Sequence, residues 1–376
     1  MRPFALRIAL LAAFFLSTAT TSKADLYSEY SLTLLQVNPQ TDEVDNELWA
    51  SAELLVGGTA GKLDWYIYLD ANRRPDKNGS ANRLGVVSGD HYTALDSDGS
   101  SRVIVAEAML GGKISQHWRL DVGLYSPGSF LDSSSVANDE TSDFVALPFY
   151  GNTAFGYPLY APGLLLGWSK GDQSLLLSVT SSNGIHDNPD ASYSELLDVT
   201  GDGKGIFAAI EWTRTTSKQQ ALRLGAWVNS RDNDRLDRPN STADNWGVYV
   251  NADSQTGLWN WNARLGFANP KVSATLFHLS LAATRPLSVG KLGFAVSLTP
   301  ASPKLNAEHD NSGLVELHWR WSPRSWVQLT PFAQFAYQTG YGTDPTIDRN
   351  LWVFGLRSSI EFGYSEKQWS GLFVSR

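Results

Sequence analysis

Apolar and polar residues alternate one by one in short segments that recur along almost the whole chain. The pattern is clear in residues 63–70, where every second residue is apolar. The apolar residues there are Leu63, Trp65, Ile67 and Leu69, and the residues between them are Asp64, Tyr66, Tyr68 and Asp70. A repeat of two places successive side chains on opposite faces of a β-strand. Each segment therefore predicts a strand with one apolar and one polar face.

Segments of this kind predict an even number of strands, sixteen in all. Most are about ten residues long, close to the ~9–11 residues that a tilted strand needs to cross the hydrocarbon layer of a membrane. The predicted strands cover residues 26–36, 47–56, 62–70, 102–112, 116–125, 162–169, 172–181, 204–214, 219–229, 244–252, 258–267, 272–284, 290–299, 312–321, 324–337 and 350–362.

The connections between these segments alternate in length, which favours one fold class. Tight turns lie at residues 57–61, 113–115, 170–171, 215–218 and 322–323, and long loops lie at 71–101, 126–161, 182–203, 230–243, 300–311 and 338–349. The connection near residues 269–271 is an exception, because it is short where a long loop is expected. A soluble β-sandwich would show no such rhythm, whereas membrane barrels do. We therefore predict an all-β fold, a 16-stranded antiparallel transmembrane β-barrel.

The two ends of the chain differ from this pattern. Met1, Arg2 and Arg7 precede an apolar run over residues 8–16 and a small-residue site at Ala24. This order predicts a signal peptide over residues 1–24. No stretch approaches the ~20 apolar residues of a membrane-spanning helix, which excludes a helical membrane protein. The barrel is expected over residues 25–362, with residues 363–376 as a C-terminal extension.

Composition and charge add two constraints. The chain has 14 Trp, 14 Tyr, 16 Phe and 32 Gly but no Cys, so an exported protein without disulfides needs the rigidity of a closed barrel. Loss of the three basic residues in the signal peptide changes the formal net charge from -8 to -11, which argues against nucleic acid as a partner. Trp residues near strand ends predict aromatic girdles at the membrane surface. They are Trp118, Trp212, Trp246, Trp259, Trp319 and Trp352.

Two stretches of the chain resemble the carbohydrate-selective porin family of the OprB type. The first contains Val122-Gly123-Leu124-Tyr125, Phe130-Leu131-Asp132, Ala137-Asn138-Asp139-Glu140-Thr141, Phe144, Phe149, Asn152, Pro158 and Pro162-Gly163. The second contains Asn245-Trp246-Gly247-Val248-Tyr249, Leu314-Val315-Glu316-Leu317, Trp326-Val327-Gln328-Leu329-Thr330-Pro331 and Val353-Phe354-Gly355-Leu356-Arg357. Their order over nearly the whole mature chain is more specific than any single motif.

This resemblance implies a porin in the outer membrane of a Gram-negative bacterium. It implies a monomeric 16-stranded barrel that is inserted in the lipid bilayer by the barrel assembly machinery and through which small sugars such as glucose diffuse. It also implies loops that fold inward and narrow the pore, for which residues 71–101 and 126–161 are the candidates. Residues of the second loop that could form the constriction are Asp132, Asn138, Asp139, Glu140 and Asp143. Acidic loop residues can instead be solvated or bind divalent cations at the cell surface.

The alternation also predicts which side chains line the lumen. The candidates for the pore wall are Asp64, Tyr66, Asp70, Glu107, Arg119, Asp121, Arg223, Trp227, Arg264, Glu316, Arg320 and Arg357. Every basic residue among them is Arg, whose planar fork can bind vicinal hydroxyls or hold a carboxylate. The rings of Trp49, Tyr66, Tyr68, Trp227 and Tyr249 offer stacking surfaces for a sugar, with Asn260 and Asn262 as amide partners. The alternative is that acids and Arg residues pair along the wall and stiffen it.

Catalytic and metal chemistry find little support in the sequence. Residues 198–203 resemble the start of a calcium loop, but its twelfth position is Ala209. Nucleophile, phosphate-binding and metal-ligand motifs are absent, so no catalytic residue, metal or cofactor is expected. A hydrolase with a site on the outer wall is disfavoured, because His278 and Ser280 share the inward parity. We predict passive, saturable diffusion of small carbohydrates; the alternative is a general or anion-tolerant porin without a sugar site.

Overall fold

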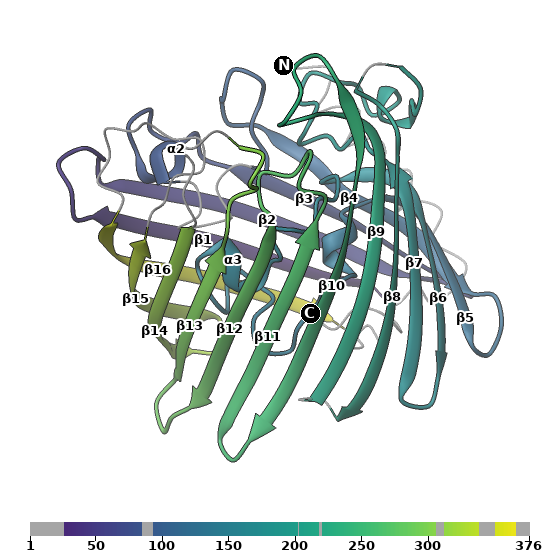
Figure 1. Cartoon of the computed structure of the whole chain (residues 1–376). Helices are drawn as coiled ribbons and strands as arrows, with labels where there is room; N and C mark the ends of the chain where they lie inside the picture. Colours follow the sequence, from purple (N-terminus) through teal and green to yellow (C-terminus); the bar gives the residue numbers. More distant parts are fainter. Residues whose placement is uncertain are drawn as a thin grey trace, which may run out of the picture.

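The computed structural model describes residues 26–84, 93–201, 203–217, 220–305, 312–337 and 350–365. In this part of the chain sixteen strands pair antiparallel with their sequence neighbours, and β16 pairs with β1 to close the barrel (Figure 1). The predicted fold class is confirmed. The predicted signal peptide lies outside the described residues, as does the tail from residue 366. Among the described helices, none has the length and apolar character to span a membrane.

The strands agree with the predicted segments to within a few residues at most ends. Their bounds are β1 (Leu26–Pro39), β2 (Glu47–Ala60), β3 (Leu63–Asn72), β4 (Val103–Lys113), β5 (Trp118–Tyr125), β6 (Ala161–Lys170), β7 (Gln173–Ser181), β8 (Ile206–Ser217), β9 (Gln220–Asp234), β10 (Thr242–Thr256), β11 (Trp259–Ala268), β12 (Phe277–Pro286), β13 (Lys291–Thr299), β14 (Ser312–Arg324), β15 (Val327–Tyr337) and β16 (Asn350–Ser365). Short helices lie in the connections: α2 (Ser80–Leu84), η1 (Pro127–Ser129), α3 (Leu147–Tyr150) and η2 (Glu195–Leu197).

Several predicted boundaries were wrong, and two of them change the picture of the barrel. β12 begins at Phe277 rather than at residue 272, because the N–H groups of Val272 and Ser273 both bind the carbonyl of Asn269 and form a turn there. The connection after β11 is therefore a loop, and the exception to the length rhythm disappears. β16 continues past Phe362 to Ser365, because Tyr27 of β1 is its pairing partner at that end.

The two ends of the barrel differ as the rhythm predicts. At one end, here called the turn end, connections such as residues 171–172 and 257–258 are tight, and Gly171 and Gly257 adopt φ values of +64° and +62° that favour glycine. At the other end, the loop end, the longest connections are residues 73–102, 126–160 and 182–205. The loop end thus carries the segments that can cover or enter the lumen.

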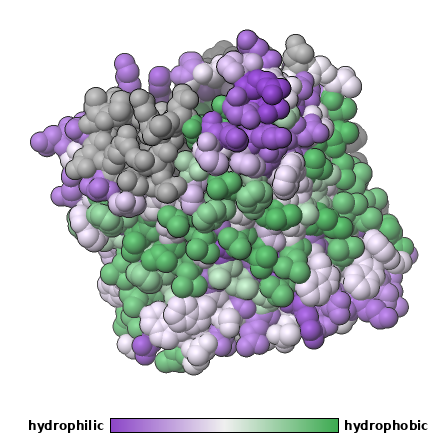
Figure 2. All heavy atoms as spheres, in the orientation of Figure 1, coloured by the Kyte–Doolittle hydropathy of each residue, from purple (hydrophilic) through white to green (hydrophobic). Residues whose placement is uncertain are grey.

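The outward face of the barrel is apolar. Figure 2 shows green hydrophobic side chains across the middle of the wall and purple hydrophilic ones at its upper edge. Outward residues such as Leu110, Val122 and Leu265 are exposed, which suits contact with lipid rather than water. Trp319 stacks on Trp321 near the turn end with ring centroids 6.2 Å apart, as expected for an aromatic girdle.

Large rings on the inner face lie over glycines of the neighbouring strand. Tyr249 is paired with Gly225, and a Cβ atom on that glycine would overlap the phenol ring. His318 covers Gly293 in the same manner. Further pairs of this kind are Tyr27 with Gly57, Trp227 with Gly247 and Phe332 with Gly355. The glycines let the rings lie flat against the wall, which leaves room in the lumen for the long loops.

Candidate functional site

The chain leaves the wall after β5 and enters the barrel, and Glu107 on β4 holds it at that point. Its carboxylate accepts hydrogen bonds from the N–H of Ser126 at 3.1 Å and the hydroxyl of Ser129 at 2.7 Å. The hydroxyl of Tyr66 donates to the second oxygen at 2.9 Å. Glu107 is buried, so this predicted lumen residue binds the start of loop 126–160. We call residues 126–160 the lumen loop.

Arg264 on β11 holds the middle of the lumen loop through its backbone. Nη1 donates to the carbonyl of Phe149 at 2.6 Å, and Nη2 donates to the carbonyls of Ala137 and Asp132 at 2.7 and 3.2 Å. Nε lies 3.2 Å from the carboxylate of Asp132 in an ion pair. The Arg264 side chain is buried. The planar fork therefore binds three loop segments that are separate in sequence.

Asp132 is the most enclosed of the predicted constriction residues. Its N–H donates to Glu211 at 2.7 Å, and its carboxylate accepts from Asn251 at 2.9 Å. These bonds hold its backbone at a φ of +56°, a left-handed conformation that Asp adopts more readily than most residues. Burial raises the pKa of Asp132, and the charge of Arg264 opposes that rise. Asp132 thus binds the wall rather than facing the solvent.

Asp253 on β10 is a second contact point that the sequence analysis missed. Its carboxylate accepts from the hydroxyl of Ser134 at 2.6 Å and the N–H of Ser135 at 2.9 Å. The predicted lumen residue Arg223 donates to it at 3.1 Å. The predicted strand ended at residue 252, but the alternation continues to Thr256. Extending the alternation by one residue would have placed Asp253 inside.

Glu316 on β14 binds the segment that leads into α3. Its two carboxylate oxygens accept from the N–H groups of Val145 and Ala146 at 3.1 Å each. The ring of His318 lies 3.0 Å from the same carboxylate and 4.8 Å, between centroids, from the ring of Phe144. In Figure 1, α3 lies behind β13 and β12, which it contacts. Glu316 is buried, and its negative charge stabilises the N–H groups at the start of α3.

Arg357 on β16 holds the tip of the lumen loop. It donates to the carbonyls of Glu140 and Asp143, the latter at 3.0 Å. Ser359 donates to the carbonyl of Thr141 at 3.1 Å. The loop therefore contacts inward side chains on β4, β8, β10, β11, β14 and β16. These contacts lie on both sides of the lumen, so the loop crosses it.

Three charged side chains at the loop remain accessible. Lys291 on β13 lies 3.0 Å from Asp143 of the loop, and Arg320 on β14 lies 4.0 Å from the same carboxylate. Their side chains are 15–22% exposed. Arg320 also binds the carbonyl of Ser142. Lys291 was not among the predicted lumen residues, although it pairs with Arg320 on the inner face; it is the first residue of its strand, beside a turn, where the alternation is hard to read.

Acidic and amide groups line the wall on β2, β1, β16 and β15. Ser31 on β1 pairs with Glu53 of β2 on one side and with Glu361 of β16 on the other. Its hydroxyl donates to Glu53 at 2.8 Å. Gln328 donates to Glu361 at 3.1 Å. These side chains are partly exposed. Together with Lys291 and Arg320, they place both charge signs where a solute could reach them.

The other predicted lumen and loop residues have binding partners of their own. Arg119 forms ion pairs of 2.6 Å with both Asp64 and Asp121 near the turn end. Asp70 accepts from Thr93 of loop 73–102 at 2.6 Å. Asn138 accepts from the N–H of Ser134 at 2.9 Å, within the lumen loop itself. Asp139 accepts from the N–H of Thr141 at 2.6 Å, again within the loop.

The lumen aromatic rings are covered by the lumen loop. Phe155 lies 5.0 Å from Tyr249 and 6.0 Å from Trp227, between ring centroids. Trp49, Tyr66 and Tyr68 are also buried. Of the two predicted amide partners, Asn262 is buried and donates to Asn251 and Asp253 at 2.7 and 2.9 Å, whereas Asn260 is partly exposed. In this conformation the predicted stacking surfaces contact protein.

Glu140 lies at the tip of the lumen loop in an acidic environment. Burial raises the pKa of its carboxyl from 4.5 to about 8, with further contributions from the charges of Asp139, Glu53 and Asp70. It borders a small cavity together with Arg357 and Trp49. The charge of Glu140 therefore changes near neutral pH.

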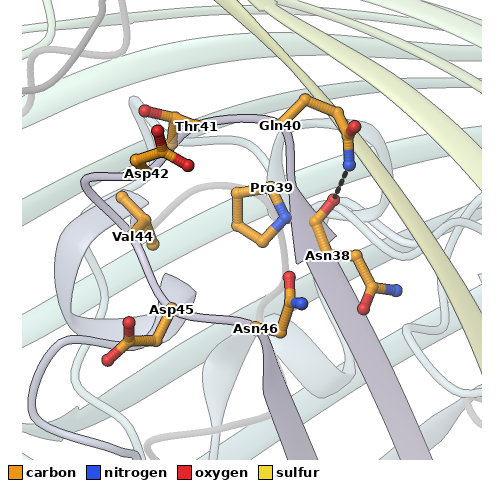
Figure 3. Close-up of a pocket in the computed structure, with 8 residues that line it drawn as sticks. All are labelled: Asn38, Pro39, Gln40, Thr41, Asp42, Val44, Asp45 and Asn46. Carbon is orange, nitrogen blue, oxygen red and sulfur yellow. Dashed lines mark hydrogen bonds between the residues drawn. The ribbon is translucent and has the colours of Figure 1, made fainter.

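A separate hollow of about 610 Å³ lies at the loop end, between β1 and β2 (Figure 3). The residues around it are Asn38, Pro39, Gln40, Thr41, Asp42, Val44, Asp45 and Asn46. Gln40 donates to the carbonyl of Asn38 at 3.3 Å, drawn as a dashed line in Figure 3. Its lining is mostly amide and carboxylate and has no aromatic ring, so it resembles a wet vestibule more than a binding pocket.

The residues that could suggest an enzyme or a metal site have structural contacts instead. His278 contacts Thr153 and Ser280 at 3.1 Å each and is buried on the inner face, not on the lipid face. Within the described residues no group of three or more His, Cys, Asp or Glu side chains could hold a metal ion. Asp198, at the start of the calcium-like segment, pairs with Lys204 at 3.0 Å.

Comparisons with known proteins agree with this geometry. The family model described as carbohydrate-selective porin, OprB family, matches residues 87–362. No curated protein matches the sequence. The structure is similar to that of OprB from Pseudomonas putida, with a TM-score of 0.70 and 14% identity over 93% of this chain and 97% of that one.

Other solved structures are also similar. OmpF of Salmonella typhi in complex with daunomycin has a TM-score of 0.57 and 12% identity, covering 90% of this chain and 97% of that one. A loop-deletion mutant of OmpT from Vibrio cholerae has a TM-score of 0.54 and 13% identity, covering 90% and 99%. At such low identities these likenesses establish the fold alone.

Proposed function

Because the chain belongs to the OprB family of carbohydrate-selective porins, it is a non-enzymatic channel of the Gram-negative outer membrane, and we propose that glucose-like monosaccharides diffuse through it. The diffusion is passive and saturable. The lumen loop forms the constriction, and solutes pass beside its tip. Residues 73–84 and 93–102 narrow the pore further at the loop end. Thr93 donates a hydrogen bond to Asp70 on β3, and α2 donates one to Glu47 on β2.

One observation carries this proposal: the lumen loop is bound on both sides of the barrel by buried side chains. Arg264 alone binds three of its carbonyls, and Glu316 binds two of its N–H groups. A loop held through its backbone keeps a fixed shape, so the polar groups beside it keep fixed positions toward a passing solute. A fixed constriction is what discrimination between solutes of similar size requires.

The accessible charges beside the loop suit a neutral, polar solute. Lys291 and Arg320 donate hydrogen bonds, whereas Glu53 and Glu361 accept them, and a sugar hydroxyl can do both. Opposite charges at short range orient such a solute without favouring either ion sign strongly. We therefore assign substrate contacts to these residues rather than to the buried Arg264 and Arg357.

A second candidate is a general or anion-tolerant porin without a sugar site. The burial of Trp227 and Tyr249 beneath Phe155 favours it, because the expected stacking surfaces are covered. The two functions differ in one property. A sugar site saturates, whereas a pore without one responds to sugar only through the viscosity of the solution.

Single-channel conductance in planar bilayers separates the two candidates. Glucose is titrated from micromolar to high millimolar concentration, with glycerol at matched viscosity as the control. A dose-dependent block of the ion current that saturates with glucose but not with glycerol supports the sugar site. Equal, shallow decreases with both solutes would leave the general porin as the function.

We also propose that one chain forms the complete pore. Among the described residues, the contacts that hold the lumen loop come from several strands of the same chain, which supports a constriction built by one copy. The barrel assembly machinery inserts it through β16, whose outward Phe362 stacks on Trp326 at 5.3 Å. The mass of the protein–detergent complex tests the first point: a trimer that conducts only when intact would refute it.

A further inference from the structure

One stretch of the barrel wall lacks a strand on one side. β4 pairs with β3 along most of its length, but its pairing with β5 covers only Ala108–Lys113. β5 ends at Tyr125, where the chain turns into the lumen. In the part of the chain that the structure describes, no strand pairs with residues 103–107 on that side. Within a membrane, backbone N–H and C=O groups on such an edge need another partner.

Tyr193 supplies that partner from loop 182–205. The N–H of Val105 donates to the Tyr193 hydroxyl at 2.9 Å, and the hydroxyl donates to the carbonyl of Val105 at 3.1 Å. One phenol thus satisfies both backbone groups of a residue on the open edge. This is the bonding that a neighbouring strand would otherwise provide.

The segment after Tyr193 closes the remaining space. η2 follows directly and packs against β6, the strand on the far side of the open stretch. Leu196 is fully buried, so the segment packs on the wall rather than extending away from it. Arg102, just before β4, donates to the carbonyls of Pro189 and Ile185 at 2.7 and 3.0 Å and holds the rest of the loop.

The outer surface of this segment carries apolar side chains among polar ones. Leu197 is 66% exposed, and Val199 and the ring of Tyr193 are also exposed. Val103 on β4 is 63% exposed beside them. Two large aliphatic side chains with this exposure are costly in water but favourable in hydrocarbon. The neighbouring strands carry exposed lipid-facing residues too, so the apolar surface of the wall continues across the segment.

We propose that residues 193–199 form part of the membrane-facing wall and contact the acyl chains of the outer leaflet. Tyr193 takes the place of a strand, and Leu197 and Val199 extend the lipid-facing surface over the stretch that β5 leaves open. Glu195 and Asp198 are exposed, and the proposal places their carboxylates at the level of the headgroups. Loop 182–205 is then a structural element of the barrel and not a surface loop.

The absence of Cys makes a direct test possible, because any introduced Cys is the only one. Leu197→Cys is spin-labelled in lipid vesicles, and its collisions with oxygen and with a water-soluble nickel chelate are compared. Val122→Cys on the lipid face of β5 and Arg238→Cys in the exposed loop after β9 are the controls. The label at residue 197 is expected to behave like that at 122, reached by oxygen and protected from nickel.

Two results would overturn the proposal. Access of nickel to residue 197 equal to that at residue 238 would place the segment in water. Protection from both oxygen and nickel, with spin–spin broadening, would mean that a second copy of the chain covers it.

The role of the phenol is tested by Tyr193→Phe, with Tyr30→Phe on the lipid face as the matched control. Loss of the hydroxyl leaves the Val105 N–H without its partner, so its hydrogen exchange should accelerate and the label at residue 197 should become more mobile. Tyr30→Phe should change neither quantity. Unchanged exchange at Val105 in the Tyr193 variant would show that the hydroxyl does not replace a strand.

Discussion

The guanidinium of Arg264 lies 3.2 Å from the carboxylate of Asp132, and both side chains are excluded from solvent. An ion pair thus joins β11 in the wall to the lumen loop, and water cannot replace either partner because both are buried. Breaking such a pair on one side leaves an uncompensated buried charge, which costs about 3–5 kcal/mol. The same guanidinium also binds three carbonyl groups, so it determines the shape of the constriction as well as its stability.

Arg264→Ala is expected to loosen the lumen loop while the barrel remains closed. The three carbonyls that bind its fork lose their donor, and the loop moves away from β11. Conductance and current noise should increase, and the saturating block by glucose should weaken. Planar-bilayer recording measures both quantities.

Arg264→Lys separates charge from geometry, because an ammonium keeps the ion pair but cannot bind three separate carbonyls. Its conductance should lie between those of the wild type and the Ala variant. Arg214→Lys, in an exposed pair with Asp172, is the control and should leave conductance unchanged. A conductance of Arg264→Ala equal to that of the wild type would show that the loop is held without this residue.

Gly266→Ala should displace the lumen loop from the wall without removing a hydrogen bond of the barrel. A Cβ atom at residue 266 would overlap the amide group of Asn152, which lies directly against the β11 backbone. Overpacking of this kind costs about 1–3 kcal/mol. The temperature at which the folded barrel is lost on a denaturing gel should fall, and conductance should change. Gly363→Ala, where the nearest atom is 3.8 Å away, should do neither.

Asp143 and Lys291 should control ion selectivity more than stability. Their pair is partly exposed, and such pairs contribute about 1 kcal/mol or less. Asp143→Asn leaves Lys291 and Arg320 unopposed, so the pore should become more selective for anions. Lys291→Gln should shift selectivity toward cations. Reversal potentials in a salt gradient report both, and shifts in the same direction for the two variants would contradict the assignment.

The fold was predictable from the sequence because strand alternation and loop length are local signals. The alternation from Leu63 to Asp70 can be recognised within eight residues. Closure of the barrel follows from the even number of strands and from the alternation of short and long connections. The errors lie at strand ends. Lys291 was missed there because one residue of alternation beside a turn cannot be distinguished from the turn itself, and Asp253 because the predicted strand ended one residue before it.

The contacts of the lumen residues were less predictable, because parity gives the face of a side chain but not what covers it. Arg264 and Arg320 have the same parity, yet one is buried beneath the loop and the other is partly exposed. The difference depends on the path of residues 126–160, which has no periodicity. Burial of Tyr249 under Phe155 likewise depends on contacts between residues distant in sequence.

The carboxyl of Glu140 should give the pore a pH dependence near neutrality. Its pKa is raised from 4.5 to about 8 in the folded protein. The raised pKa means that the folded state retains the proton where the unfolded chain has lost it. The contribution of this group to stability is therefore complete below pH 4.5, decreases as pH rises and is lost above pH 8. Above that pH a new negative charge lies beside Asp139 and Glu53 and repels the tip of the loop.

We therefore expect conductance and cation selectivity to rise together between pH 7 and pH 9.5, with a midpoint near pH 8. Glu140→Gln cannot ionise and should show a flat profile at the low-pH level of the wild type. Asp98→Asn, an exposed loop acid, is the control and should keep the wild-type step. Because Gln preserves the size of the side chain, a step that persists in Glu140→Gln would assign the titration to another group.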